Sequence, residues 1–309
     1  ALISLSDLDD RDMAMAKSGP WWENSSQRSL SNNSAVYNTF PGMSRFMEEW
    51  ANMYNSHSGE RGICNREAMS TLAAKSGRAP AEFGTNPCSE IILRPKQFCN
   101  LTEVVVRNYD TIATLRHKVR MAAILGTLQS ACTKFAYLDH EWKNNCEEER
   151  LLGVSFTGIY DNVEMSTCSD ELREGLRTLK QEVKDTNTKW AEILGINPSL
   201  ATTCCKPSGT TSCVAGTSSG IHPRFSPYYM RRVRIDNKNP MCEFMIAQGF
   251  PHEPCTMRPD TTEIFSFPLK SPDGALTYEN YSPIKHLDLW LLYQQEWCEH
   301  KPSVTVNYT

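Results

Sequence analysis

An amide, a thiol and a carboxylate stand at alternate positions of one short segment, as Asn86, Cys88 and Glu90. Side chains at alternate positions of an extended segment project to the same side. The spacing therefore predicts that these three groups face a single space. The alternative is a turn at Asn86 that leads into a strand carrying a buried cysteine.

A second thiol, Cys99, follows Cys88 after eleven residues, which is enough chain to turn and bring the two sulfurs together. The alternative is again a small buried residue. A third segment, residues 206–212, is dense in hydroxyl groups and small side chains, and its backbone amides could cradle a phosphate if a helix begins there. It is not a Walker A loop, because its lysine precedes the glycine. A hydroxyl-rich turn can equally be a helix cap.

The cysteine count is high, with 12 in 309 residues, but no two have the C-x-x-C spacing of a structural zinc or thioredoxin-type centre. We therefore expect no metal site. A disulfide framework is also not expected, since a chain of this length can build its own core. Most of the cysteines are predicted to be reduced and buried.

The composition is that of an ordinary globular enzyme, with 40% hydrophobic and 22% charged residues. The net charge of -4 argues against non-specific contact with nucleic acid. No apolar run is long enough to span a membrane, and the first residues do not resemble an export signal. We expect a cytoplasmic protein without membrane or direct nucleic-acid contacts.

Helical and extended patterns alternate along the chain, which predicts an α/β fold with much parallel sheet. The predicted helices span residues 7–17, 40–54, 111–135, 171–194 and 284–298. The predicted strands span residues 35–37, 90–93, 101–106, 153–156, 233–235, 264–267 and 303–307, with another around Ile63. Residues 1–6 look like the end of an element that is cut into. With no repeat or linker, we expect one domain over residues 1–309.

Taken in this order, the segments resemble the catalytic subunit of ribonucleotide reductase. Asn86, Cys88 and Glu90 match its Asn-x-Cys-x-Glu motif, and the short return to Cys99 followed by Asn-Leu is similar to the cobalamin-dependent class II branch. The resemblance covers nearly the whole chain and implies part of a ten-stranded α/β barrel with a central finger loop. The residues it assigns to the substrate phosphates are Pro207, Ser208, Gly209, Thr210, Thr211 and Ser212.

The resemblance also implies a mechanism that makes deoxyribonucleotides, the precursors of DNA. Cys88 carries a transient thiyl radical, Glu90 acts as general base on the 3′ hydroxyl, and Asn86 orients the ribose. Cys99 is one thiol of the reducing dithiol, which thioredoxin or a similar donor resets by exchange. Class I enzymes relay the radical through a tyrosine pair on a late strand, and residues 303–307 hold no such pair. Adenosylcobalamin is therefore the implied radical source.

The chain departs from the family pattern at both ends. The family's partner of Cys99 lies on an early strand upstream of everything here, and its shuttle cysteines lie in a C-terminal tail that is absent. We therefore expect an incomplete barrel, which could need a separate chain that carries the missing portion. Two alternatives remain: a class I large-subunit fragment, and an inactive half that only assembles with a partner.

One further loop resembles the family's link between the allosteric nucleotide and the substrate base. Its candidate residues are Gln27, Arg28, Asn32 and Asn33, and the implied effector is a deoxynucleotide or ATP. The alternative is a polar surface loop. The substrate is a ribonucleoside triphosphate or diphosphate, and the cysteine spacing is closer to the triphosphate enzymes.

Overall fold

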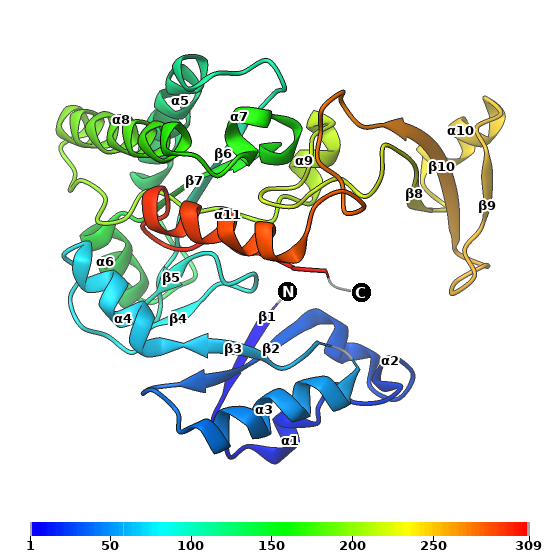
Figure 1. The fold of residues 1–309 in the computed structure, drawn as a ribbon, viewed down its shortest axis with the longest axis horizontal. Helices are drawn as coiled ribbons and strands as arrows, with labels where there is room; N and C mark the ends of the chain where they lie inside the picture. Colours follow the sequence, from blue (N-terminus) through cyan, green and yellow to red (C-terminus); the bar gives the residue numbers. More distant parts are fainter. Residues whose placement is uncertain (1, 58, 308–309) are drawn as a thin grey trace.

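The computed structural model describes residues 2–57 and 59–307, which form four small β-sheets surrounded by helices (Figure 1). The strands in this part of the chain are β1 (Leu2–Ser6), β2 (Ser31–Tyr37), β3 (Gly62–Asn65), β4 (Gly84–Thr85), β5 (Ile92–Leu93), β6 (Asn100–Val105), β7 (Leu152–Thr157), β8 (Tyr228–Asp236), β9 (His252–Pro254) and β10 (Thr262–Lys270). The longer helices are α3 (Met43–Ser56), α4 (Arg66–Lys75), α5 (Ile112–Ser130), α6 (His140–Glu149), α8 (Asp170–Leu194), α10 (Pro240–Ala247) and α11 (Pro283–Glu296). The shorter helices are α1 (Arg11–Ala14), α2 (Trp21–Asn24), α7 (Val163–Ser166) and α9 (Thr210–Ala215), with 3₁₀ turns η1 (Ser26–Leu30) and η2 (Ile159–Asp161).

Two parallel sheets form the two halves of the fold. In the first, β2 lies between β1 and β3. In the second, β6 pairs with β7, and Leu101 lies opposite Gly153. Backbone hydrogen bonds extend this sheet to residues 201–205 and from there to residues 301–303. All six residues of β7 are buried, as is typical of a parallel strand covered on both faces.

Long helices cover the second sheet and build the main core. α5 packs against α8, β6 and β7, and α11 packs against α8. The buried face of α8 carries Leu172, Leu176 and Leu179 at helical spacing. Gly175 allows α5 and α8 to approach closely, because a β-carbon there would lie 2.6 Å from Ile112 Cδ1.

The strands β4 and β5 form a short antiparallel hairpin between the two halves (Figure 1). From the first half, Asn32 Nδ2 donates a hydrogen bond to the Pro87 carbonyl at 2.6 Å. From the second half, the Lys301 N–H donates to the Glu90 carbonyl at 3.1 Å. The turn of the hairpin is therefore attached to both halves, as expected of a finger loop.

The strands β8, β10 and β9 form a separate antiparallel sheet that, with α10, projects to one side (Figure 1). Its small core contains Cys242, Met245 and Phe265. The strands predicted at 233–235 and 264–267 are present within β8 and β10. These two strands pair with each other in antiparallel orientation.

The long predicted helices are confirmed as α3, α5, α8 and α11, with ends shifted by a few residues. The helix predicted at 7–17 is reduced to α1, and the strand predicted at 303–307 is absent from the described residues, where only a single bridge joins Pro302 to Cys205. Residues 2–6 form β1, whereas Ala1 lies outside the described part of the chain.

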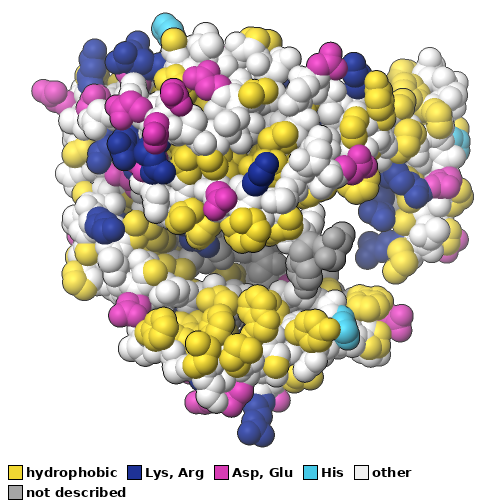
Figure 2. All heavy atoms as spheres, viewed as in Figure 1, with side chains coloured by type: hydrophobic (Ala, Val, Ile, Leu, Met, Phe, Trp, Pro, Cys, Tyr) yellow, Lys and Arg dark blue, Asp and Glu magenta, His cyan; other side chains and the backbone are white. Residues whose placement is uncertain are grey.

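The surface is hollowed between the half that carries α3 and the half that carries α11 (Figure 2). In the half that carries α3, this helix exposes Met43, Met47, Trp50 and Tyr54. No helix among the described residues is both long enough and apolar enough to cross a membrane.

Candidate active site

The turn of the hairpin, residues 86–91, is closed by the side chain of its first residue. Asn86 Oδ1 accepts the Ile91 N–H at 3.0 Å, and the Asn86 carbonyl accepts the Ser89 N–H at 2.9 Å. Ser89 has a φ of 63°, which is uncommon for a residue other than glycine. The predicted extended segment is therefore wrong, because the asparagine side chain stabilises a turn instead.

This turn places Cys88 and Glu90 in different environments, one exposed to solvent and one buried. Cys88 is exposed, whereas Glu90 is 0% exposed and both of its carboxylate oxygens lack a hydrogen-bond partner. Desolvation and the negative charge of Glu90 raise the pKa of Cys88, and the Lys206 ammonium opposes this shift. Cys88 and Glu90 are thus brought together with Lys206, at the start of the predicted phosphate segment.

Cys99 immediately precedes β6 and is half-buried. Burial and then the negative charge of Glu90 raise the pKa of Cys99, whereas the Arg78 guanidinium lowers it. The carboxylate of Glu90 therefore lies within electrostatic reach of both Cys88 and Cys99, and the proximity of the two thiols to each other stays a prediction.

The predicted phosphate segment is a tight loop that leads into α9. Ser208 is buried, and its hydroxyl donates to Glu103 Oε2 at 2.8 Å and accepts the Ser212 N–H at 3.1 Å. The Ser212 hydroxyl donates back to the Ser208 carbonyl. The two serines therefore hold the loop, whereas Gly209 and Thr210 are exposed at its surface.

The remaining residues of this segment are Pro207, which is half-buried, and Thr211, which is exposed. The backbone of Gly220 packs against the same loop with a φ of +52°. A β-carbon at Gly220 would lie 2.3 Å from the Lys206 carbonyl oxygen, so only glycine fits this approach.

The predicted effector loop is partly regular structure. Gln27 and Arg28 are exposed in η1, and the Arg28 guanidinium donates to the Ala16 carbonyl. Asn32 and Asn33 already belong to β2. Of the four residues, Asn32 contacts the turn at residues 86–91, through its hydrogen bond to the Pro87 carbonyl.

Two residues near the end of the chain belong to the site although sequence spacing did not find them. His300 is fully buried, and its Nδ1 accepts the Ile92 N–H at 3.3 Å while its Nε2–H donates to the Leu152 carbonyl at 3.1 Å. Burial and the nearby Arg78 guanidinium lower the pKa of His300 to about 3. Burial also lowers the pKa of Lys301, whereas the negative charges of Cys64 and Glu90 partly raise it again. No local pattern marks either residue, because each meets the hairpin only in three dimensions.

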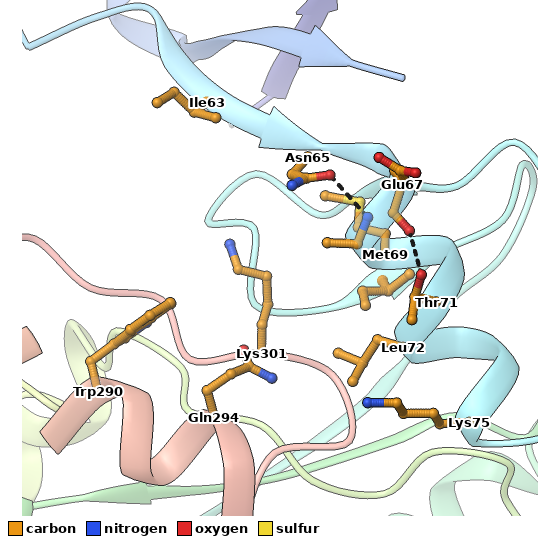
Figure 3. Close-up of a pocket in the computed structure, with 12 residues that line it drawn as sticks. Ile63, Asn65, Glu67, Met69, Thr71, Leu72, Lys75, Trp290, Gln294 and Lys301 are labelled. Carbon is orange, nitrogen blue, oxygen red and sulfur yellow. Dashed lines mark hydrogen bonds between the residues drawn. The ribbon is translucent and has the colours of Figure 1, made fainter. Parts of the chain in front are cut away.

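A cavity of about 700 Å³ lies beside the hairpin, between α4 and α11 (Figure 3). Trp290, Gln294 and Lys301 line one side, and Asn65 and Leu72 face them across the opening (Figure 3). This is the size of a small-molecule site. It borders the hairpin through β5, but its lining includes neither of the two thiols nor the phosphate segment. Within the described residues, no group of three or more His, Cys, Asp and Glu side chains could hold a metal ion.

No protein-family model matches the chain. It is 28% identical over 261 residues to the adenosylcobalamin-dependent ribonucleoside-triphosphate reductase of Euglena gracilis, which covers 82% of this chain and 34% of that protein. The enzyme of the same name from Lacticaseibacillus paracasei is 27% identical over 344 residues and covers 100% of this chain and 44% of its own length. The chain therefore spans between a third and a half of the length of these relatives.

Among solved structures, a B12-dependent class II ribonucleotide reductase matches with a TM-score of 0.77 and 21% identity, over 99% of this chain and 46% of that one. A class Id ribonucleotide reductase alpha subunit from Actinobacillus ureae matches with a TM-score of 0.55 and 14% identity, over 80% of this chain and 52% of that one. The fold is thus that of the class II barrel, as the sequence motifs predicted.

Proposed function

Because the chain is a homologue of the adenosylcobalamin-dependent ribonucleoside-triphosphate reductases, we propose that it reduces ribonucleoside triphosphates to 2′-deoxyribonucleotides. The observation that carries this proposal is the environment of Glu90. Its side chain is fully buried and its carboxylate has no hydrogen-bond partner. Its negative charge raises the pKa of both Cys88 and Cys99. A buried carboxylate without a partner is unfavourable, and a functional requirement explains its presence. We propose residues 1–309 as one catalytic domain that acts in the cytoplasm.

The proposed roles follow the environments of the three residues. Cys88, exposed at the turn, gives up its S–H hydrogen atom and then takes the 3′ hydrogen of the ribose. Glu90 accepts the proton of the 3′ hydroxyl, as a general base must be able to do within hydrogen-bond reach. Asn86 orients the ribose through its amide nitrogen, because its amide oxygen already binds the Ile91 N–H.

The phosphates of the substrate are proposed to bind at the loop before α9. The hydroxyls of Ser208 and Ser212 are used within the loop. The exposed residues, Gly209, Thr210 and Thr211, are therefore the ones proposed to contact the phosphates, through backbone N–H groups and threonine hydroxyls.

Because Cys88 is exposed, a radical source bound at the surface of this chain could reach its thiol. When bound, adenosylcobalamin supplies an organic radical by homolysis of its cobalt–carbon bond. Cys88 is the chain's own group that would meet this radical, whereas Cys99 lies deeper.

Two partners are proposed in addition to the substrate. Cys99 would pass its oxidising equivalents to thioredoxin or a similar dithiol by exchange. A deoxynucleotide or ATP effector would act through the segment that includes Asn32, since the hydrogen bond from Asn32 to Pro87 connects this segment directly to the catalytic turn.

The test is to incubate the chain with adenosylcobalamin, a ribonucleoside triphosphate and a dithiol. We expect cob(II)alamin by absorbance and deoxynucleotide by chromatography, with less product from the matching diphosphate. Activity that requires an iron-containing subunit instead would support the class I alternative. If neither product forms, the chain is an inactive half that needs a partner chain.

A further inference from the structure

Arg78 is a buried cation that joins three elements around the catalytic hairpin. Its side chain is 1% exposed. It donates to the Ile92 carbonyl of β5 at 2.9 Å, to Gln97 Oε1 at 3.2 Å and to Glu149 Oε2 at the end of α6 at 2.9 Å. One guanidinium therefore connects the hairpin, the segment that precedes β6 and the second half of the fold.

The segment between the hairpin and β6 depends on these contacts. Gln97 Oε1 also accepts the Arg94 N–H at 3.1 Å, and its amide nitrogen donates to Glu149 Oε2. The Phe98 N–H donates to Cys146 Sγ at 3.3 Å. Cys99 is the next residue, so the position of its thiol follows from a network centred on Arg78.

Charged and titratable groups from several elements act on Cys99. Burial raises its pKa most, Glu90 of the hairpin and Cys146 of α6 raise it further, and Arg78 lowers it. Burial also raises the pKa of Cys204, in the segment that pairs beside β7, and Cys99 adds to that shift. Arg78 is thus the cation that opposes the negative charge of Glu90 at this thiol.

We propose that Arg78 is a positioning residue for Cys99: it fixes the segment 94–98 against the hairpin, so that the Cys99 thiol is held in place, and its positive charge opposes the carboxylate of Glu90. The proposal rests on the proposed function, which makes Cys99 a reducing thiol. Thiol–disulfide exchange proceeds through the thiolate, so a buried reducing thiol next to a carboxylate needs such a cation.

The test compares variants that separate charge, hydrogen bonds and fold. Arg78→Met leaves the buried Glu149 with only the more distant Arg94 guanidinium, at 4.0 Å, as a cation, which is destabilising, whereas replacing both members of a buried ion pair by apolar side chains is often tolerated. The informative variants are therefore R78M/E149L, which removes the pair, and Arg78→Lys, which keeps the charge. The matched control is R61M/E49L, because Arg61 and Glu49 form an equally buried pair at 2.7 Å in the other half of the fold.

The readout is the rate at which iodoacetamide alkylates Cys99, measured residue by residue by mass spectrometry from pH 7 to 9.5, with exposed Cys88 as internal reference. In R78M/E149L we expect Cys99 to react about tenfold more slowly at pH 8.5, the lower end of the effect of one adjacent opposite charge. R78K keeps the charge but not the forked hydrogen bonds, so its Cys99 rate should fall between those of R78M/E149L and the unmodified chain. R61M/E49L should stay within about twofold of the unmodified chain. Cys88 should keep its rate in all variants.

Two results would overturn the proposal. One is a folded R78M/E149L variant, shown by circular dichroism, in which Cys99 reacts at the original rate. The other is an equal loss of Cys99 reactivity in R61M/E49L. Since no substrate or cofactor is present, these results are independent of whether the chain reduces ribonucleotides. An inactive chain with the expected alkylation pattern would count against the proposed function alone.

Discussion

His300 is predicted to make the stability of the fold depend on pH. In the folded chain its Nδ1 is an acceptor for the Ile92 N–H and its Nε2–H is a donor to the Leu152 carbonyl, so the ring is neutral. Protonation would place a second N–H against the Ile92 N–H inside a fully buried site. Burial, together with the nearby Arg78 guanidinium, lowers the pKa of His300 to about 3 in the folded state, against 6.5 for an ordinary histidine.

The direction and size of the effect follow from linkage. Between pH 3 and 6.5 the unfolded chain binds a proton at this residue that the folded chain does not, so stability falls as the pH falls through this window and is constant above it. At pH 5, one and a half units below the unfolded pKa, His300 should cost about 2 kcal/mol relative to pH 7.5.

The variant His300→Asn removes this titration and retains an amide oxygen near the position of Nδ1. At pH 7.5 it should lower the free energy of unfolding by about 1–3 kcal/mol, through the lost bond to Leu152 and the poorer fit. At pH 5 the difference from the unmodified chain should shrink by about 2 kcal/mol.

Urea unfolding followed by tryptophan fluorescence at pH 5, 6 and 7.5 measures both effects. His117→Asn is the matched control, because His117 is exposed on α5 and its replacement should leave the pH profile unchanged. If the free energy of unfolding falls equally in H300N and in the unmodified chain on acidification, His300 is not the group responsible for the pH dependence.

The remaining predictions concern the thiols, the carboxylate and one glycine. Cys88→Ser should abolish both cob(II)alamin and deoxynucleotide, whereas Cys99→Ser should keep the first and lose the second; full turnover of C99S with a dithiol would refute its role. Glu90→Gln should retain substrate binding by equilibrium dialysis but slow product formation by about 100- to 10,000-fold, and an unchanged rate would exclude a general base here. Gly220→Ala should destabilise more than Gly195→Ala in urea, because both have positive φ but only Gly220 has a backbone carbonyl oxygen 2.3 Å from the added β-carbon.

The sequence predicted the long helices, because their apolar residues recur at helical spacing over many turns. The apolar faces of α5 and α8 repeat over many residues, so their helical period is unambiguous. The pairing of β8 with β10 could not be predicted in the same way. The pattern of residues 233–235 and 264–267 indicates short apolar strands but not their orientation. Which strands pair depends on how the separate sheet of β8, β9 and β10 folds in three dimensions.

The sequence could indicate the candidate site only where one short segment carries the chemistry. Asn86, Cys88 and Glu90 were singled out by their alternate spacing and their match to the family motif, and their roles stay a prediction; the turn gives Cys88 and Glu90 opposite exposure. His300 and Lys301 were missed because they reach the hairpin from more than 200 residues away, through one hydrogen bond at Ile92 and one at Glu90.

The contacts of the hairpin explain how the fold can keep Glu90 buried without a hydrogen-bond partner. Burying such a carboxylate opposes folding, so the backbone that carries it must be held by other groups. The Lys301 N–H binds the Glu90 carbonyl, the Asn86 side chain closes the turn before it, and His300 and Arg78 bind the two backbone groups of Ile92. None of these four groups donates a hydrogen bond to the carboxylate itself. The hairpin is therefore stabilised through its backbone, and the carboxylate oxygens stay free of hydrogen bonds from these groups, as the proposed general base requires.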